Sequence, residues 1–418
     1  MAGMRARIVG ARPRIVVFGA FDRHNLGDLL FAHVAETLLG QTCECLFAGL
    51  VERDLRALGG HRVRPIAQVA AETPDALLHA GGEILDCDAW TAAVMLLEPD
   101  AAAAIVARLD AKPAERDAWA RQLLGAALHV APASVPRAPY VVSRAAMPNV
   151  GRVVFGSVGG VELARREPAL RAEVLGALRL ADRVTVRDAS TQEHLRSHRI
   201  DAALVPDPVV AIEALFGERI RSHAATSPAL ARVRSSLPDG WLAVQFSADF
   251  GDDASLAMIA AQLDATSRDT GLGIALFRAG AALWHDTLEV LQAIAVRMNA
   301  PTLVFESLDV WDLCALIAAS RGFCGSSLHG GIVAAAFGLP RVNVEHPSKD
   351  ASAAKQRAYA ASWEDETQAG VVAVDALHAG LRAALAVDRE RCERAAHALA
   401  ARYLRDFETV RAALTAQS

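Results

Sequence analysis

The segment RGFCGSSLHGGIVAAAFGLPRVNV, residues Arg321–Val344, contains the signals of a strand, a turn and a helix in direct succession. A short apolar strand, expected at Gly322–Cys324, leads into Ser326–Ser327, where a helix N-cap is expected. A helix of small residues follows and stops at Gly338, just before Pro340. Signals at both ends of the helix therefore predict the strand-to-helix unit from which parallel α/β sheets are built.

The same alternation continues on both sides of this segment. Short apolar runs without polar alternation are typical of strands covered on both faces, and Ala-, Leu- and Arg-rich helical patterns lie between them. The expected strands are Arg14–Phe18, Ala76–His79, Arg152–Ser157, Arg183–Val186, Ala203–Val205, Trp241–Phe246, Gly273–Phe277, Thr302–Phe305 and Arg341–Val344. The expected helices include Leu29–Leu39, Pro168–Leu180, Thr191–Ser197, Ser255–Thr266 and Asp309–Ala319. We predict an α/β protein with two Rossmann-like domains whose mainly parallel sheets face a central cleft.

The length of 418 residues is suited to two domains rather than one. We expect an N-terminal Rossmann-like domain over 1–225, with a helical insertion at about 88–139, and a C-terminal Rossmann-like, donor-binding domain over 226–385. Residues 386–418 read as a C-terminal helix able to pack back on the first domain. The polar stretch Asp207–Asp239 is the candidate hinge.

Composition excludes several classes of protein. Apolar residues make up 53% of the chain, charged residues 22%, and the net charge is −5, which argues against a nucleic-acid partner. The six cysteines are scattered and read as reduced thiols, and no metal-ligand spacing appears, so no metal site is expected. No apolar run is long enough to cross a membrane. The expectation is a soluble cytoplasmic protein without an integral membrane segment, working either free or at the inner face of the membrane.

The candidate site residues lie in loops that follow expected strands. In the first turn of the helix after Gly325, Ser327, His329, Gly330 and Gly331 are placed to bind an anion, because a helix N-terminus offers free N–H groups. The alternative is that the histidine caps its own turn and that the glycines only allow helix–sheet packing.

Two more loops are candidates. Asn25, Gly27 and Asp28 follow the first strand, and Asp28 is the expected N-cap of the next helix; a capped loop without further function is the alternative. Gly81 and Gly82 permit a tight turn that would place Glu83 beside a substrate hydroxyl, although this signal is weak alone.

Two basic residues complete the set. Arg187 ends a strand, where it can bind an anion through two hydrogen bonds, or instead form a surface ion pair with Asp188. Lys349, one of three lysines, follows the last expected strand and can bind an acid group, the alternative being an exposed loop lysine.

Taken together, these motifs resemble the polysaccharide pyruvyl transferase family. The resemblance covers most of the chain. It rests on the order of N-x-G-D at Asn25–Asp28, the glycine turn at Gly81–Gly82, V-R-D-x-S at Val186–Ser190, V-P-D-P at Val205–Pro208, and S-x-H followed by A-x-x-x-G-x-P at Ser327–Pro340. It implies a GT-B-like shape and transfer of pyruvate from phosphoenolpyruvate to a sugar of a cell-surface polysaccharide or of its lipid-linked or nucleotide-linked precursor. Phosphoenolpyruvate is a co-substrate, no cofactor is implied, and oligomer formation is left open.

The resemblance also assigns roles. Arg187 and His329 would hold the carboxylate and phosphate of the donor, His329 being the first choice of general acid, with Ser327, Gly330, Gly331 and Lys349 around the donor. Acceptor contacts would come from Asn25, Gly27, Asp28, Gly81, Gly82 and Glu83, and Asp28 joins Arg187 and His329 in the catalytic set. The chain departs from the family at Ser327, where arginine is usual, and at Glu83, where a third glycine is usual.

Two rival functions fit the same fold. A GT-B-like glycosyltransferase or sugar-nucleotide enzyme would use the same helix tip for a diphosphate. A catalytically inactive binding protein is suggested by Ser327, because this substitution removes a cation from the expected donor site.

Overall fold

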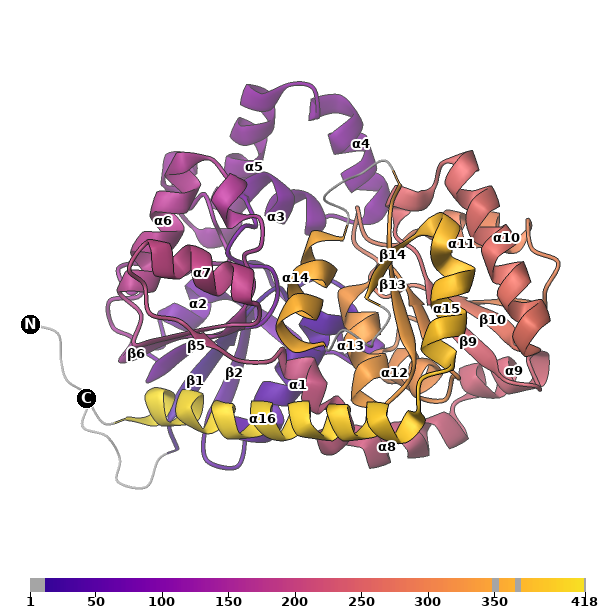
Figure 1. Ribbon diagram of the computed structural model, residues 1–418. Helices are drawn as coiled ribbons and strands as arrows, with labels where there is room; N and C mark the ends of the chain where they lie inside the picture. Colours follow the sequence, from indigo (N-terminus) through magenta and orange to yellow (C-terminus); the bar gives the residue numbers. More distant parts are fainter. Residues whose placement is uncertain (1–11, 348–352, 365–369, 417–418) are drawn as a thin grey trace, which may run out of the picture.

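The computed structural model describes residues 12–347, 353–364 and 370–416, which form two α/β halves, each with its own sheet (Figure 1). The first sheet has the strand order β3-β4-β2-β1-β5-β6-β7-β8, and every pair is parallel except β3 with β4. Its strands are β1 (Arg14–Phe18), β2 (Glu44–Gly49), β3 (Arg53–Asp54), β4 (Arg62–Pro65), β5 (Ala76–Ala80), β6 (Arg152–Val158), β7 (Arg183–Val186) and β8 (Ala203–Leu204).

The second sheet is parallel throughout, in the order β11-β10-β9-β12-β13-β14. Its strands are β9 (Trp241–Gln245), β10 (Gly273–Phe277), β11 (Thr302–Phe305), β12 (Phe323–Gly325), β13 (Arg341–Glu345) and β14 (Val371–Ala373). The predicted fold class, two mainly parallel Rossmann-like sheets, is confirmed.

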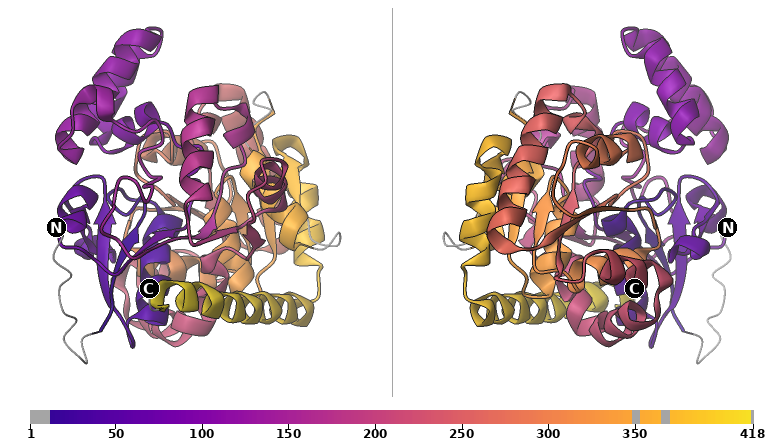
Figure 2. Two further views of the ribbon diagram at one scale, coloured as in Figure 1. Left: turned by 90° about the vertical axis from the view of Figure 1, so that its left-hand side faces the viewer. Right: turned by 90° about the vertical axis from the view of Figure 1, so that its right-hand side faces the viewer.

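Helices connect the strands and cover both sheets. They are α1 (Leu26–Leu39), α2 (Ile66–Ala70), α3 (Ala89–Met95), α4 (Pro99–Leu109), α5 (Pro113–Leu128), α6 (Pro168–Arg179), α7 (Ala189–Ser197), α8 (Ile212–Thr226), α9 (Pro228–Ser236), α10 (Asp253–Thr270), α11 (Leu288–Ala295), α12 (Val310–Ala318), α13 (Leu328–Ala336), α14 (Ala354–Trp363), α15 (Leu377–Leu385) and α16 (Arg389–Thr415). Figure 2 shows α4 and α5 standing out from the body as a pair. Among the described residues, no helix has the length and apolar character needed to cross a bilayer.

Several predicted elements differ from the structure, three of them close to the predicted site or hinge. The stretch Asp207–Asp239 is not irregular, because α8 and α9 fill most of it and bury one apolar face each. Helix α1 begins at Leu26, and its N-cap is Asn25 rather than Asp28. The strand expected at Gly322–Cys324 lies one residue later.

One apolar cluster joins the two halves. It includes Leu29 of α1 and Leu78 of β5 from the first half, and Phe277 of β10 and Trp311 of α12 from the second. Helix α16 runs along the lower edge in Figure 1 and packs against β5 and β6, so it reaches the first sheet from the far end of the second half. Its residue Phe407 is buried in the same cluster. Burial of such apolar side chains is the dominant stabilising term for the contact between the halves.

Candidate functional site

A cavity of about 330 Å³ lies where the two halves meet. Its walls come from residues that follow the carboxyl ends of strands in both sheets, together with the start of α14. Ligands of open parallel sheets bind at this end of the strands, because the helix N-termini and the loops converge there. The lining includes Arg23, Asn25, Asp28, Gly82, Glu83, Arg187, Gln245, His285, Asp286, Ser327, His329 and Lys355.

The loop after β1 is fixed by its own cap. The Asn25 side-chain oxygen accepts hydrogen bonds from the backbone N–H groups of Gly27, at 3.1 Å, and Asp28, at 3.4 Å. Asp28 is therefore free of the capping role expected for it, and its carboxylate lies 3.7 Å from the Arg23 guanidinium. The cap holds this carboxylate at the cavity wall.

Glycines bring the walls together at two places. A Cβ at Gly27 would lie 2.0 Å from His329 Nδ1, so only glycine lets the tip of α1 approach this imidazole. Gly81 and Gly82 have φ angles of 71° and 74°, which favour glycine and make the tight turn before Glu83. Gly27 and Gly81 do not line the cavity themselves, but they lie next to residues that do.

The glycines of α13 do not have the role expected of them. Ser327 caps the helix, and its hydroxyl oxygen accepts a hydrogen bond from the Gly330 N–H at 3.1 Å. The Gly331 N–H donates to the Ser327 carbonyl oxygen at 3.1 Å. A Cβ at Gly330 would lie 2.7 Å from the Phe323 ring, and neither glycine lines the cavity. The prediction that these two amides bind the donor is therefore wrong; both glycines allow α13 to pack on its sheet.

Arg187 is buried and already paired with two carboxylates. Its guanidinium donates to Glu83 at 2.5 Å and to Asp207 at 2.9 Å, and its side chain is 3% exposed. Burial opposes ionisation of Glu83, but the charge of Arg187 lowers the pKa of that carboxyl below its ordinary value. The alternative, a surface ion pair with Asp188, does not form, because Arg187 is buried and pairs with Glu83 and Asp207, while the Asp188 carboxylate caps α7.

Both carboxylate oxygens of Glu83 accept hydrogen bonds from the protein. One accepts from Arg187, and the other accepts from the Val161 backbone N–H at 2.6 Å. Its place at the cavity wall agrees with the sequence prediction, but it holds the arginine rather than offering a free oxygen to a hydroxyl. Of the two carboxylates predicted to contact the acceptor, Asp28 has the weaker interactions, since its contact with Arg23 is 3.7 Å long.

His329 lies at the centre of this group. Its Nε2 atom is 3.4 Å from an Asp207 carboxylate oxygen and 3.3 Å from an Arg187 nitrogen. Burial opposes ionisation of Asp207, but the hydrogen bond with His329 lowers its pKa. An ionised carboxylate beside an imidazole orients the ring and stabilises a positive charge on it, as in acid–base catalysis.

Sequence reasoning missed Arg23, a cation of the site whose ion pair within the described residues is the 3.7 Å contact with Asp28. In the loop after β1, Asn25 and Asp28 were predicted as site residues and Arg23 was not. The Nε and Nη1 atoms of Arg23 are buried and have no hydrogen-bond partner among the described residues. Its guanidinium lies over the Tyr140 ring, 5.3 Å from the centroid. Buried donors of this kind are costly unless a ligand or water satisfies them.

His285 adds a second unpaired donor. The Asn25 oxygen is used in the cap, so its amide nitrogen faces His285 Nδ1 at 3.2 Å and donates to it. The proton of the neutral ring therefore sits on Nε2, which is buried and without a partner in the described part of the chain. Burial, helped by Arg23 and Lys355, lowers the pKa of His285 to about 3. The ring is a neutral donor at physiological pH.

Asp286 is a carboxyl whose pKa lies near neutrality. It accepts from the Gln245 side chain at 2.6 Å and from the Ala279 N–H at 2.5 Å. Burial nevertheless raises its pKa to about 7. Lys355, at the start of α14, lines the cavity but was not predicted. The predicted lysine, Lys349, falls outside the described residues.

Seven of the predicted site residues thus line one cavity. They are Asn25, Asp28, Gly82, Glu83, Arg187, Ser327 and His329. Gly27 and Gly81 support them from behind, whereas Gly330 and Gly331 belong to the helix–sheet contact.

The family match covers part of this site. The model of the polysaccharide pyruvyl transferase family matches residues 152–348. This segment contains Arg187, Asp207, Ser327 and His329, whereas Arg23 and Glu83 precede it. Comparison of the sequence with curated proteins gives no significant match.

Solved structures resemble the chain over almost its whole length. The UDP-GlcNAc 2-epimerase from Neisseria meningitidis bound to UDP-GlcNAc has a TM-score of 0.53 at 11% identity, covering 95% of this chain and 98% of that chain. The UDP-N-acetylglucosamine 2-epimerase from Rickettsia bellii has a TM-score of 0.53 at 9% identity, covering 95% and 96%. At this identity the likeness concerns the fold alone, which is GT-B-like. Over residues 152–348, the chain is therefore similar to the polysaccharide pyruvyl transferase family.

Proposed function

We propose that this protein transfers the pyruvyl group of phosphoenolpyruvate to two hydroxyls of a sugar, forming a ketal on a cell-surface polysaccharide or on its precursor. The observation that carries the proposal is that His329, with its Asp207 partner, and Arg23 converge on one cavity between the two halves. Two Arg23 nitrogens have no hydrogen-bond partner in the described part of the chain. The family match supports pyruvyl transfer. An anionic donor and a proton source are what this reaction requires.

The donor's charge is met by Arg23, Lys355 and His285 in this proposal. Arg187 faces two ionised carboxylates, so it has little charge left to attract a phosphate or carboxylate. Within residues 12–347, 353–364 and 370–416, two buried N–H-bearing nitrogens of Arg23 and the His285 Nε2–H have no hydrogen-bond partner. A phosphate or carboxylate would satisfy these donors, as charge-assisted hydrogen bonds do.

The chemistry then proceeds by proton transfer to carbon. His329 protonates the methylene carbon of phosphoenolpyruvate, which turns the enol carbon into an oxocarbenium-like centre. One sugar hydroxyl attacks that centre, phosphate leaves, and the second hydroxyl attacks the same carbon to close the ketal. The two hydroxyl protons balance the new methyl hydrogen and the protonated phosphate. Asp28 contacts the acceptor diol.

A phosphate-release assay tests the proposal. Purified protein would be incubated with phosphoenolpyruvate and a panel of lipid-linked and nucleotide-linked sugars, and both inorganic phosphate and acid-labile ketal would be measured. We expect phosphate release that depends on one class of acceptor. Absence of release with every acceptor, together with no thermal stabilisation by phosphoenolpyruvate, would reject the function.

A sugar-nucleotide enzyme is the second candidate, favoured by the whole-length fold similarity to UDP-GlcNAc 2-epimerases, one of them bound to UDP-GlcNAc. Thermal-shift titrations with UDP-GlcNAc and phosphoenolpyruvate on the same sample separate the two candidates. Stabilisation by the nucleotide sugar alone, with its epimerisation or hydrolysis, would favour this second function.

A further inference from the structure

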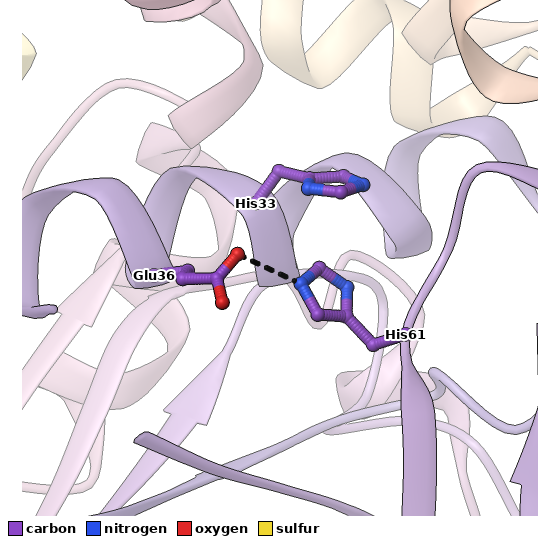
Figure 3. A group of neighbouring side chains, drawn as sticks. All are labelled: His33, Glu36 and His61. Atoms are coloured by element: carbon purple, nitrogen blue, oxygen red, sulfur yellow. Dashed lines mark hydrogen bonds and ion pairs between the residues drawn. The ribbon is translucent and has the colours of Figure 1, made fainter. Parts of the chain in front are cut away.

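A second group of chemically active side chains lies outside the cavity, on α1 and just before β4. His33 and Glu36 are one turn apart on α1, and His61 approaches them from the loop (Figure 3). One ligand atom from each of the three residues lies within 4.8 Å of the other two. Two imidazoles and a carboxylate are an established ligand set for divalent transition metals.

The orientation of His33 is fixed by its backbone partner. Its Nε2 atom lies 2.6 Å from the Gly59 carbonyl oxygen. A carbonyl oxygen only accepts, so Nε2 carries the proton, and Nδ1 of the neutral ring holds a lone pair. A histidine whose second nitrogen donates to a carbonyl is the usual arrangement for a metal ligand, because this hydrogen bond fixes the tautomer and the ring orientation.

The other two ligands already lie at coordination distance from each other. His61 Nε2 is 3.1 Å from a Glu36 carboxylate oxygen. A tetrahedral zinc site with bonds of about 2.0–2.1 Å requires about 3.3 Å between ligand atoms. Without an ion, His61 Nε2 donates to the Glu36 carboxylate; when Zn²⁺ takes the place of this proton, the neutral ring carries its proton on Nδ1, which is buried and has no partner within the described segments.

The rings are held in place by their neighbours, whereas the carboxylate remains reachable. The His61 ring lies 4.1 Å from the Phe47 ring and 4.3 Å from the His33 ring, measured between centroids. The His33 ring also lies 4.8 Å from Trp311. The Glu36 side chain is 52% exposed. An ion can therefore enter from solvent and find two imidazoles that need little reorganisation.

We propose that His33 Nδ1, Glu36 and His61 Nε2 bind Zn²⁺, with water completing the coordination. Because none of the three residues lines the cavity between the halves, the ion has a structural role. It links α1 to the loop that contains Gly59 and His61, and this loop contacts α12 of the second half: a Cβ at Gly59 would lie 3.0 Å from Trp311. The proposal is independent of the transferred group.

A second group of similar composition provides the matched control. His223, Asp309 and Asp312 also lie close together, but they offer one imidazole only. Asp312 accepts from His223, Ser227 and Ser307, and Asp309 caps α12. These carboxylates already have internal donors, so we expect no tight ion binding there.

The test uses full-length protein treated with a chelator and then dialysed. Zn²⁺ alone is titrated by calorimetry and in thermal-shift measurements, with Mg²⁺ as the comparison ion. We expect stoichiometric Zn²⁺ binding, a higher Tm with Zn²⁺, and no effect of Mg²⁺. Glu36→Gln and His61→Gln should weaken Zn²⁺ binding about 100-fold or more, because each removes a direct ligand.

The control variant His223→Gln should keep the affinity of the unmodified protein. Glu36→Gln changes a half-exposed side chain and is expected to fold, which circular dichroism would verify before titration. Unchanged Zn²⁺ affinity in Glu36→Gln and His61→Gln, or loss of binding in His223→Gln alone, would overturn the assignment.

Discussion

Arg187 and Arg23 are both buried in the same cavity wall, yet their surroundings give them opposite uses. Arg187 compensates Glu83 and Asp207, so it holds two strand-end loops and the Asp207–His329 pair in place. Arg23 has only a longer contact with Asp28 and keeps two nitrogens without partners among the described residues. In the function proposed above, Arg187 is therefore a positioning residue and Arg23 binds the donor.

Replacing the two arginines should therefore separate stability from donor binding. Arg187→Met leaves two buried carboxylates uncompensated and should lower the free energy of unfolding by about 3–5 kcal/mol. Arg23→Met removes unpaired buried donors, so we expect it to change stability by less than about 1 kcal/mol while phosphoenolpyruvate binding falls at least 10-fold. Urea unfolding and calorimetric titration measure the two effects.

Arg219→Met is the control, because this arginine lies over Trp311 and outside the cavity lining. It should preserve phosphoenolpyruvate affinity. Equal losses of affinity in Arg23→Met and Arg219→Met would contradict the donor site proposed above.

His329 should affect the chemical step more than donor binding. In His329→Gln the side chain still fits beside Gly27 but cannot transfer a proton, so kcat should fall by about 10²–10⁴-fold. The Kd of phosphoenolpyruvate should change little, since Arg23, His285 and Lys355 remain. Single-turnover phosphate release and equilibrium binding report the two quantities. A variant that loses affinity but keeps kcat would place His329 among the binding residues instead.

The sequence predicted the positions of these residues but not their pairing. Strand-end loops are recognisable from apolar runs and turn residues, so Arg187 and His329 were found as candidates. The partners of Arg187 are Asp207, 20 positions away, and Glu83, 104 positions away, and only the three-dimensional fold shows that they neutralise it. Arg23 is significant because two of its nitrogens have no hydrogen-bond partner among the residues that the structure describes, which no local sequence pattern reveals.

At the scale of single elements, helix tips decide where the side chains of the site point. The N-cap of α1 is Asn25, three residues before the predicted cap Asp28. This earlier start places the Asp28 carboxylate toward Arg23. Ser327 is the N-cap of α13, and it fixes the first turn of that helix, where His329 lies.

Ser327→Ala should weaken this helix tip measurably. Loss of the hydroxyl leaves the Gly330 N–H without its partner, and N-cap replacements of this kind cost about 1 kcal/mol. Ser327→Asp retains an acceptor and should restore stability, although its charge should weaken binding of an anionic donor. Guanidinium unfolding of the three proteins checks the expected order; equal stability of Ser327→Ala and the unmodified protein would exclude the cap as a stabilising contact.

Some elements lacked a clear signal in the sequence. Strands β2 and β4 lie toward one edge of the first sheet and include exposed residues such as Glu44 and Arg62, so they do not form continuous apolar runs. Helices α8 and α9 carry many charged residues on their outer faces and were taken for an irregular hinge. Strands β1, β7, β10 and β11 were predicted with correct ends. For the inner strands β1 and β10, burial on both faces makes the runs almost fully apolar.

At the scale of the whole molecule, the buried acidic groups connect stability to pH. Asp86 lies in the turn after β5 and is 4% exposed. Burial, together with the neighbouring charge of Glu83, raises the pKa of Asp86 to about 7, although Lys355 opposes the shift. The folded protein therefore retains a proton that the unfolded chain loses near pH 3.8.

The free energy of unfolding should consequently fall as pH rises from 4 to 7, by up to roughly 4 kcal/mol from this group. Asp86→Asn keeps the size and an acceptor oxygen without the charge, so it should flatten that decline and raise stability at pH 8. Asp100→Asn, on the exposed surface of α4, should leave the pH profile unchanged. Thermal unfolding between pH 4 and 8 provides the comparison; parallel profiles for Asp86→Asn and the unmodified protein would show that Asp86 does not titrate in this range.

The position of α16 has a consequence for the order in which the molecule matures. During translation the strands β1 to β8 leave the ribosome well before residues 403–414, which include Tyr403, Phe407 and Val410 against the first sheet. Until then the nascent first half exposes an apolar strip that includes Phe31 and Leu78, a surface on which chaperones or other nascent chains can bind. The first half is thus synthesised first, but its apolar strip is covered only when α16 has been synthesised.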